Sequence, residues 1–347
     1  MTQAELSERS RQVLQAIILD YIRTAEPVGS HAVAKHYAFK LSPATVRNTM
    51  ADLEEKGYVV QPHTSAGRVP TDKAYRLYVD QLGGQSQLNR KEVEQLHRAY
   101  ATAGDPVDGV LDWTARELSR LSHYAAVVLA PPLKQTVFAR LDLTPLPEDQ
   151  VLVLVVTETG WVTSRVLGRP TGMGAEQLAA LARSFTESFG GKTFQEILDL
   201  TGTGAVATPA DNEALLLNQV LRIIQERNLY IGGAINILDH PEFWDLSNMR
   251  VVFRAFEEKR QLIGLLSERA GEAGVSVLIG RENPCEEMHE CSLVTSPYTY
   301  RDRVLGILGV VGPKRMPYTK VVPLVDYTAK LVSRSLARLG QDPHIPA

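Results

Sequence analysis

The stretch Ser42–Thr71, SPATVRNTMADLEEKGYVVQPHTSAGRVPT, carries the pattern that decides the fold of the N-terminal region. Ser42 is suited to cap a helix whose first position is Pro43, and Gly57 is suited to end it. The apolar run after Gly57 favours a strand, and Arg68–Pro70 favours a short returning strand. A helix followed by a two-stranded ribbon is the second half of a winged helix-turn-helix.

The residues on either side of this stretch predict the rest of the same motif. Apolar side chains recur at helical spacing over residues 7–25, and a proline and a glycine then break the helix. A second, short helix is expected over residues 30–37. Thr71 is expected to cap a further helix that runs to Leu82. The whole pattern predicts a winged helix-turn-helix.

The predicted third helix has one apolar side, formed by Val46, Met50 and Leu53. The opposite side and its flanks carry small or hydrogen-bonding residues: Ala44, Thr45, Arg47, Asn48 and Ala51. Small side chains allow a helix to enter the major groove of DNA, where bulky ones would hold it away from the bases. Acidic residues crowd the second half of the helix, so only its first turns are expected to meet DNA.

The loop between the two predicted strands is expected to form the wing. Gly67 permits a tight turn, and the prolines at 62 and 70 reduce the freedom of the loop before binding. Arg68, with Thr64 and Ser65, can then reach a phosphate or the minor groove. The alternative is an ordinary hairpin turn with one solvated arginine, but the preceding helices favour DNA.

Local charge supports a DNA-binding surface. Residues 30–76 contain seven Lys or Arg and four Asp or Glu, a net charge of +3, whereas the whole chain of 347 residues carries −3. Any attraction to phosphate must therefore come from a local patch.

Each predicted contact has a role. Asn48 and Thr45 are predicted to read base edges, and Arg47 to bind phosphate or guanine. Lys73 and Arg76 are predicted to hold the DNA backbone. The full set of predicted DNA-binding residues is Ser42, Thr45, Arg47, Asn48, Thr64, Ser65, Arg68, Lys73 and Arg76.

The overall composition, 44% hydrophobic and 22% charged, is that of a water-soluble globular protein. Its two cysteines, Cys285 and Cys291, exclude a disulfide framework. The polar N-terminus does not read as a signal peptide, and the apolar run at residues 151–156 is too short to span a bilayer. We therefore expect a cytoplasmic protein that associates with the nucleoid.

Beyond residue 105 the pattern predicts a sheet that is interrupted and then resumed. The first strands are expected at 124–130, 137–143, 151–157 and 161–167, followed by helices at 175–189 and 209–228 and a strand at 229–238. A helix at 248–270, strands at 275–280, 292–298 and 304–311, and a last helix at 320–339 follow. Strands on both sides of a helical block indicate a sheet domain that contains an insertion. The apolar stripe at 216–224 fits either a core or a dimer face.

Two other stretches contain residue types found in chemical sites without completing one. CEEMHEC, Cys285–Cys291, lacks a second cysteine pair and the second histidine of HExxH, so a solvated loop between strands is favoured. GILGVVGPKR, residues 306–315, lacks the ending of a phosphate loop, and its glycines are expected to let a buried strand pack closely. No nucleophile elbow is present. We therefore expect no enzyme activity, no metal and no cofactor.

Four segments of this chain resemble the bacterial heat-inducible transcription repressor family HrcA, in the same order and at similar spacing. They are EPVGS at 26–30, the segment from SPAT to YVD at 42–80, IGRENP at 279–284, and GVVGPKRMPYTKVVPLVDYTAKLVSRSL at 309–336. The resemblance implies an α+β fold with an N-terminal winged helix-turn-helix, a GAF-like antiparallel-sheet domain, and an inserted dimerisation domain of helices and sheet. The implied boundaries are 1–83 for the winged helix, 84–104 for a linker, 105–168 and 246–340 for the GAF-like domain, and 169–245 for the dimerisation domain.

The resemblance also implies a function. A homodimer would bind an inverted-repeat operator, the CIRCE element, upstream of chaperone operons. The implied regulator is the GroE chaperonin, which helps the repressor reach its active fold; when unfolded protein occupies the chaperonin after heat shock, repressor is lost. Heat sensing is then expected through a marginally stable multidomain fold.

Two other functions stay open from the sequence. One is a metabolite-responsive repressor whose GAF-like domain binds an effector. The other is an enzyme with a DNA-binding head, which would need a catalytic cluster that the sequence does not show.

Overall fold

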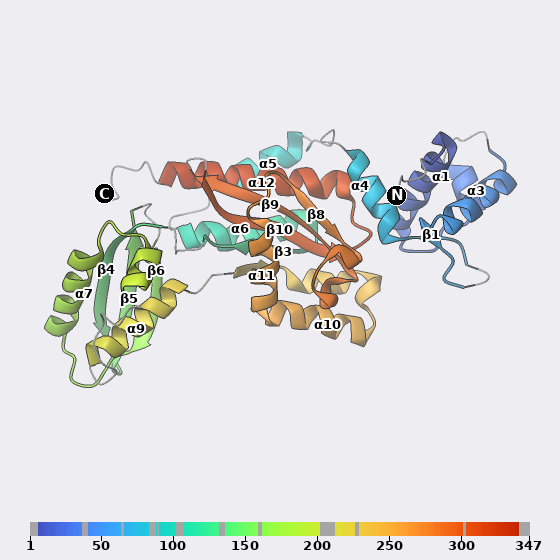
Figure 1. Cartoon of the computed structure of the whole chain (residues 1–347). Coiled ribbons are helices and arrows are strands. Elements are labelled where there is room, and N and C mark those ends of the chain that lie inside the picture. Colours follow the sequence, from blue (N-terminus) through green and yellow to red (C-terminus); the bar gives the residue numbers. More distant parts are fainter. Residues whose placement is uncertain are drawn as a thin grey trace.

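The computed structural model describes residues 6–36, 41–63, 66–82, 88, 90–101, 107–131, 136–158, 162–201, 212–225, 229–300 and 303–339. Figure 1 shows three bodies in a row, with the helical N-terminal body and a small sheet body at opposite ends of a larger sheet body. We call them the winged-helix body (residues 6–82), the central body (residues 88–131 and 229–339) and the inserted body (residues 136–225). The fold is α+β with antiparallel sheets, as predicted.

The winged-helix body follows the predicted order of elements. These are α1 (Glu8–Thr24), α2 (Ser30–His36), α3 (Pro43–Glu55), β1 (Val59–Val60), β2 (Val69–Pro70) and α4 (Asp72–Leu82). The two short strands pair antiparallel. Val46, Met50 and Leu53 of α3 are at most 4% exposed, so the apolar side predicted for this helix is confirmed.

Ser42 and Gly57 begin and end α3 as predicted, whereas Thr71 differs from its prediction. The Ser42 hydroxyl accepts a hydrogen bond from the Thr45 N–H at 3.2 Å, and Gly57, after the end of α3, has a positive φ of 74°. Thr71 precedes α4, but its hydroxyl donates to the carbonyl oxygen of Gly57 at 2.8 Å. Thr71 therefore fastens the start of α4 to the end of α3, and the prediction that its side chain caps α4 is corrected.

Five strands form the antiparallel sheet of the central body, in the order β7-β3-β10-β9-β8. They are β3 (Ala125–Leu129), β7 (Leu229–Gly232), β8 (Ser276–Ile279), β9 (Cys291–Tyr300) and β10 (Arg303–Pro313). The helices are α5 (Arg90–Ala101), α6 (Val107–Ser122), α10 (Leu246–Glu257), α11 (Lys259–Arg269) and α12 (Tyr318–Leu339). Short 3-10 helices are η3 (Ala234–Asp239), η4 (Pro241–Phe243), η5 (Gly280–Glu282) and η6 (Glu286–Met288).

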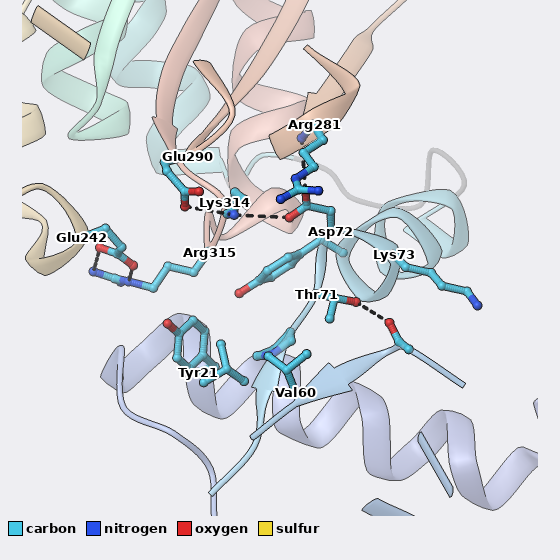
Figure 2. Close-up of a pocket in the computed structure, with 14 residues that line it drawn as sticks. Tyr21, Val60, Thr71, Asp72, Lys73, Glu242, Arg281, Glu290, Lys314 and Arg315 are labelled. Carbon is cyan, nitrogen blue, oxygen red and sulfur yellow. Dashed lines mark hydrogen bonds and ion pairs between the residues drawn. The ribbon is translucent and has the colours of Figure 1, made fainter. Parts of the chain in front are cut away.

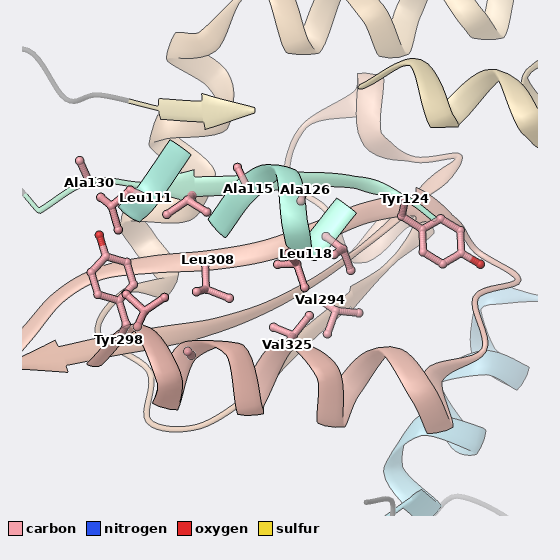
Figure 3. Packing of buried hydrophobic residues seen from close by; sticks show 14 of the residues in the cluster. Leu111, Ala115, Leu118, Tyr124, Ala126, Ala130, Val294, Tyr298, Leu308 and Val325 are labelled. Carbon is pink, nitrogen blue, oxygen red and sulfur yellow. The ribbon is translucent and has the colours of Figure 1, made fainter. Parts of the chain in front are cut away.

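Helices cover both faces of the central sheet. Val128 of β3 belongs to the same apolar cluster as Leu118 of α6 and Val325 of α12, and Figure 3 shows side chains of these helices meeting those of the sheet. The neighbouring residue Val127 belongs to a second cluster with Leu266 of α11. Because β3 is buried on both faces, its sequence AAVVL is apolar without alternation.

The inserted body leaves the central sheet after β3 and returns at β7, which are neighbouring strands. Its elements are β4 (Phe138–Leu146), β5 (Gln150–Thr157), β6 (Val162–Gly168), α7 (Ala175–Phe189), α8 (Phe194–Leu200) and α9 (Asn212–Gln225). The three strands form a separate sheet in the order β4-β5-β6. The Phe138 ring of β4 packs against Phe185 of α7 at 5.4 Å and Phe194 of α8 at 5.7 Å.

This strand pairing differs from the expected division at residue 169. β4, β5 and β6 pair with one another in a separate sheet, and β4 packs on α7. Residues 229–245, expected in the insertion, instead lie on the central sheet, where Ile237 and Phe243 are buried. Apolar alternation predicts that a segment is a strand, but the sheet it joins depends on partners far along the chain.

Three segments differ from their predicted secondary structure. Within the expected linker at 84–104, residues 90–101 form α5, and its His97 Nε2 lies 2.8 Å from the Tyr327 hydroxyl of α12. The helix predicted at 248–270 is two helices separated at Glu258, whose ψ of 62° is not helical. The strand predicted at 229–238 ends at Gly232, and η3 follows it.

Gly233, between β7 and η3, carries a backbone constraint that can be tested. Its φ is +58°, and a Cβ at this position would overlap the Ser119 hydroxyl. We expect Gly233→Ala to destabilise the central body by about 2 kcal/mol, because backbone strain and overlap act together. Gly271→Ala is the control, since a Cβ there meets no atom within 4 Å. Thermal unfolding followed by circular dichroism should show a lower midpoint for Gly233→Ala alone, and equal midpoints would contradict this interpretation.

Candidate nucleic-acid interface

The surface that α3 presents to solvent contains the residues predicted to read DNA. Ala44, Arg47 and Asn48 are exposed, and Thr45 is half-buried. The side chains of Arg47 and Asn48 make no hydrogen bond or ion pair with any residue that the structure describes. Their side chains are therefore available to a partner, and their predicted exposure is confirmed.

The beginning of α3 brings two hydroxyl groups together. The Ser42 and Thr45 hydroxyl oxygens lie 3.0 Å apart, and the Ser42 hydroxyl also accepts the Thr45 N–H. The first amides of a helix point outward and attract anions such as phosphate. Ser42 thus shapes the helix start that would approach the DNA.

The wing is held against the connection between α1 and α2. The Arg68 N–H donates to the Val28 carbonyl oxygen at 2.8 Å, and the Val28 N–H donates to the Arg68 carbonyl oxygen at 2.9 Å. A Cβ on Gly67 would overlap the Val28 carbonyl group. Gly67 is therefore needed for the close approach of two backbone segments, a role that the turn prediction missed. Thr64 and Ser65, predicted to contact DNA, lie outside the described residues.

The Arg68 side chain does not take its predicted place at the wing surface. Its guanidinium lies 2.8 Å from Glu54 Oε2 on α3, and only 17% of the side chain is exposed. Glu54 Oε1 also accepts the Gln61 N–H at 3.1 Å. The pair therefore ties both ends of the wing to α3. From the sequence, Glu54 was interpreted only as an acid that repels phosphate, and its contacts with Arg68 and Gln61 were not predicted.

Lys73 also has a partner inside the winged-helix body. Its Nζ donates to the Lys56 carbonyl oxygen at 2.9 Å and lies 4.4 Å from the centre of the Tyr58 ring. A cation at this position satisfies a carbonyl at the end of α3 and complements the helix dipole. Lys73 thus serves the C-terminal end of α3, at the opposite end from the turns predicted to meet DNA.

Arg76 faces the central body instead of solvent. Its Nε donates to Glu282 Oε1 at 2.8 Å, and a terminal nitrogen donates to the Val277 carbonyl oxygen at 2.6 Å. The hydrogen bond to Glu282 raises the pKa of Arg76, so the guanidinium stays charged. In this arrangement Arg76 joins the two bodies, and its contact with the DNA backbone stays a prediction. Glu282 is 206 residues away in sequence, so local charge could not identify it.

Asp72, the first residue of α4, is the centre of a charged junction between the two bodies (Figure 2). One carboxylate oxygen accepts the Arg281 N–H at 3.0 Å, and the other lies 3.4 Å from Lys314 Nζ. Lys314 Nζ also lies 3.0 Å from Glu290 Oε2. Gly280 has a φ of +53°, and a Cβ there would overlap the Asp72 carboxylate. The carboxylate thus occupies space that only a glycine leaves open.

Arg315 makes the second link of this junction. It pairs with Glu242 of η4, which Figure 2 shows as a two-point contact. A terminal nitrogen donates to the Ile22 carbonyl oxygen, in the last turn of α1, at 3.1 Å. Neither link was predicted from the sequence, where the only sign of them is the basic pair Lys314-Arg315 directly after the apolar stretch GILGVVGP.

The two stretches considered as chemical sites have other roles. Burial raises the pKa of the Cys285 thiol to about 11 and that of Cys291 to about 12, so both stay protonated at neutral pH. Across the described ranges, no group of three or more His, Cys, Asp or Glu residues is placed to hold a metal ion. A Cβ on Gly309 would overlap the Val294 carbonyl oxygen, which confirms close strand packing.

No helix in the described part of the chain is long and apolar enough to cross a membrane.

Two family profiles match this chain. The profile described as "Winged helix-turn-helix transcription repressor, HrcA DNA-binding" matches residues 5–82. The profile described as "HrcA protein C terminal domain" matches residues 108–322. Together they cover the winged-helix body and most of the other two bodies.

Curated relatives share this similarity over nearly their whole length. A protein of Geobacter sulfurreducens named "Heat-inducible transcription repressor HrcA" is 45% identical over 342 residues, covering 96% of this chain and 98% of that protein. Proteins with the same name from Pelotomaculum thermopropionicum and Methylococcus capsulatus are 39% and 36% identical, each covering 96% of this chain and 98% and 96% of those proteins. A solved structure described as a hypothetical protein has a similar fold, with a TM-score of 0.68, 23% identity, and coverage of 96% of this chain and 100% of that one.

The Glu54–Arg68 pair can be tested by removing the acid. We expect Glu54→Ala to lower the stability of the winged-helix body by about 1–2 kcal/mol, because Arg68 loses its charged partner in a largely buried place. Glu55→Ala is the matched control, since Glu55 is adjacent and exposed. Differential scanning calorimetry of the full chain should show a lower transition for Glu54→Ala only. A shift of equal size in both variants would show that charge, and not the pair, is responsible.

Proposed function

This chain belongs to the HrcA family of heat-inducible transcription repressors, and on that premise we propose that it binds an inverted-repeat operator of the CIRCE type as a homodimer. The family is one of transcription repressors and not of enzymes. Binding in the cytoplasm, upstream of chaperone operons, would block their transcription until heat shock.

The observation that carries this proposal is the exposed first half of α3. Asn48 is proposed to read a base edge with Thr45, and Arg47 to bind a phosphate or a guanine. Ala44, beside them, is too small to hold the helix out of the groove. Glu55 and the other acids near the end of α3 would face phosphates unfavourably, so the helix is proposed to enter the groove by its N-terminal turns.

The proposed dimer is supported by the surface of the inserted body. Leu216, Val220 and Ile223 of α9 are buried within the chain, so this stripe, which the sequence left open, is core. Other large apolar side chains remain exposed on the inserted body: Val166 at 52%, Leu200 at 47% and Leu215 at 45%. Apolar groups left in water favour a protein contact, and a two-fold dimer would match the symmetry of an inverted repeat.

We further propose that heat acts by unfolding the repressor and that the GroE chaperonin restores it. The three-body arrangement supports this view, because a multidomain chain is marginally stable and its recovery depends on refolding. If purified protein kept full operator affinity well above the heat-shock temperature without chaperonin, this part of the proposal would fail.

Base reading by Asn48 is tested with fluorescence anisotropy on a palindromic CIRCE-type duplex and a scrambled duplex, across a salt series. We expect Asn48→Ala to weaken binding to the palindrome by about 1–3 kcal/mol while the salt dependence persists. Arg47→Ala should weaken binding to both duplexes and reduce the salt slope by about 1 if it binds phosphate. Arg334→Ala, at an exposed position of α12, is the control and should bind like the unchanged protein.

The same experiment can reject the proposal. If the unchanged protein bound both duplexes weakly and equally, even after treatment with chaperonin, it would not read sequence through α3. If Asn48→Ala bound the palindrome as well as the unchanged protein, base reading would have to lie elsewhere.

A further inference from the structure

A cavity of about 620 Å³ lies between the winged-helix body and the central body (Figure 2). One wall comes from α1, the wing strands and the first turn of α4, and the other from residues around η4, η5 and the end of β10. Ligand pockets commonly have volumes of about 300–1,000 Å³ and often lie between domains. Its size and place are therefore those of a site for a small molecule.

The charged groups of the cavity leave a net positive charge. Its cationic side chains are Lys73, Arg281, Lys314 and Arg315, and its acidic ones are Asp72, Glu242 and Glu290. All three acids are already paired with Lys314 or Arg315. The Arg281 guanidinium is exposed and makes no hydrogen bond or ion pair with any described residue. Lys73 has no acidic partner in the cavity either, but it already donates to the Lys56 carbonyl oxygen, so Arg281 is the cation that remains for a bound anion.

The Tyr75 hydroxyl is the second, independent sign of a ligand. Tyr75 lines the cavity but is only 2% exposed, and its hydroxyl oxygen has no hydrogen-bond partner among the residues that the structure describes. Buried polar groups in folded proteins almost always have a partner. Tyr21 also lines the cavity, and Figure 2 shows its hydroxyl directed toward the side that carries Arg315.

The Tyr75 and Tyr21 hydroxyls are protonated, so both can donate a hydrogen bond to an anion. Burial raises the pKa of Tyr75 well above its ordinary value, and burial and then Glu242 raise that of Tyr21. Both hydroxyls therefore keep their protons at neutral pH and can donate hydrogen bonds.

We propose that this cavity binds a small phosphate group, held by the Tyr75 and Tyr21 hydroxyls and the Arg281 guanidinium. Phosphate offers several acceptor oxygens to donors that come from different directions, and an arginine fork matches two of them. The cavity exceeds the volume of orthophosphate, so a phosphorylated metabolite is also accommodated. Because Tyr75 and Arg281 belong to different bodies, the ligand would bridge the winged helix and the central sheet. This site is independent of the proposed operator contacts of α3.

The test is isothermal titration calorimetry on the full chain, with inorganic phosphate as the first probe and adenosine monophosphate as the second. We expect saturable binding of one phosphate per chain, and Tyr75→Phe and Arg281→Gln should each weaken it about tenfold, because each removes a donor to a charged ligand. Arg334→Gln, on α12, is the matched control and should bind unchanged. Tighter binding of adenosine monophosphate than of phosphate would identify a phosphorylated metabolite as the ligand, and equal or weaker binding would identify free phosphate.

Two outcomes would overturn the proposal. The first is no saturable heat with either probe. The second is binding that Tyr75→Phe and Arg281→Gln leave unchanged, or that Arg334→Gln weakens equally, as expected for diffuse attraction to surface charge. Circular dichroism and the melting temperature without ligand show whether Tyr75→Phe has folded. Arg281 is exposed, so Arg281→Gln gives a result that does not depend on the core.

Discussion

The pairing of β3 with both β7 and β10 is the constraint on which the arrangement of this chain depends. β3 is buried on both faces and hydrogen-bonded at both edges, so it has no free side on which the sheet could be rearranged. The pairing with β7 brings the chain back after the inserted body, which therefore projects from one end of the central sheet (Figure 1). The pairing with β10 sets the direction in which Lys314 and Arg315 leave the sheet.

Those two residues connect the sheet to the winged-helix body. Lys314 reaches Asp72 at the start of α4, and Arg315 reaches the end of α1. Exposed ion pairs are individually weak, but here several act with the contact of the Tyr75 and Tyr318 rings, whose centres are 6.2 Å apart. The position of α3 relative to the sheet is therefore set by many small contributions. A ligand or a change in temperature that altered a few of them would change the position of α3 relative to the central sheet.

Within the winged-helix body, some polar side chains have partners inside the protein and others stay exposed. Arg68, Lys73 and Arg76 each have a partner inside the protein, whereas Arg47 and Asn48 remain available. The net charge of +3 over residues 30–76 counts Arg68, Lys73 and Arg76 as if they were free. It therefore overstates the positive charge that this body offers to DNA. The start of α3, with its outward amides and its free arginine, is the part of this body best suited to bind an anionic groove.

The sequence by itself determined the order of elements in the winged helix, the burial of Val46 and Leu53, and the exposure of Asn48. Caps, glycine conformations and apolar spacing act over a few residues, so they can be recognised without the fold. Only the tertiary structure decided that β4, β5 and β6 form a separate sheet, that Arg76 binds Glu282, and that Arg315 binds Ile22 at a separation of 293 residues. These contacts arise when distant segments are brought together, and no local pattern encodes which distant partner a strand or a charge will meet.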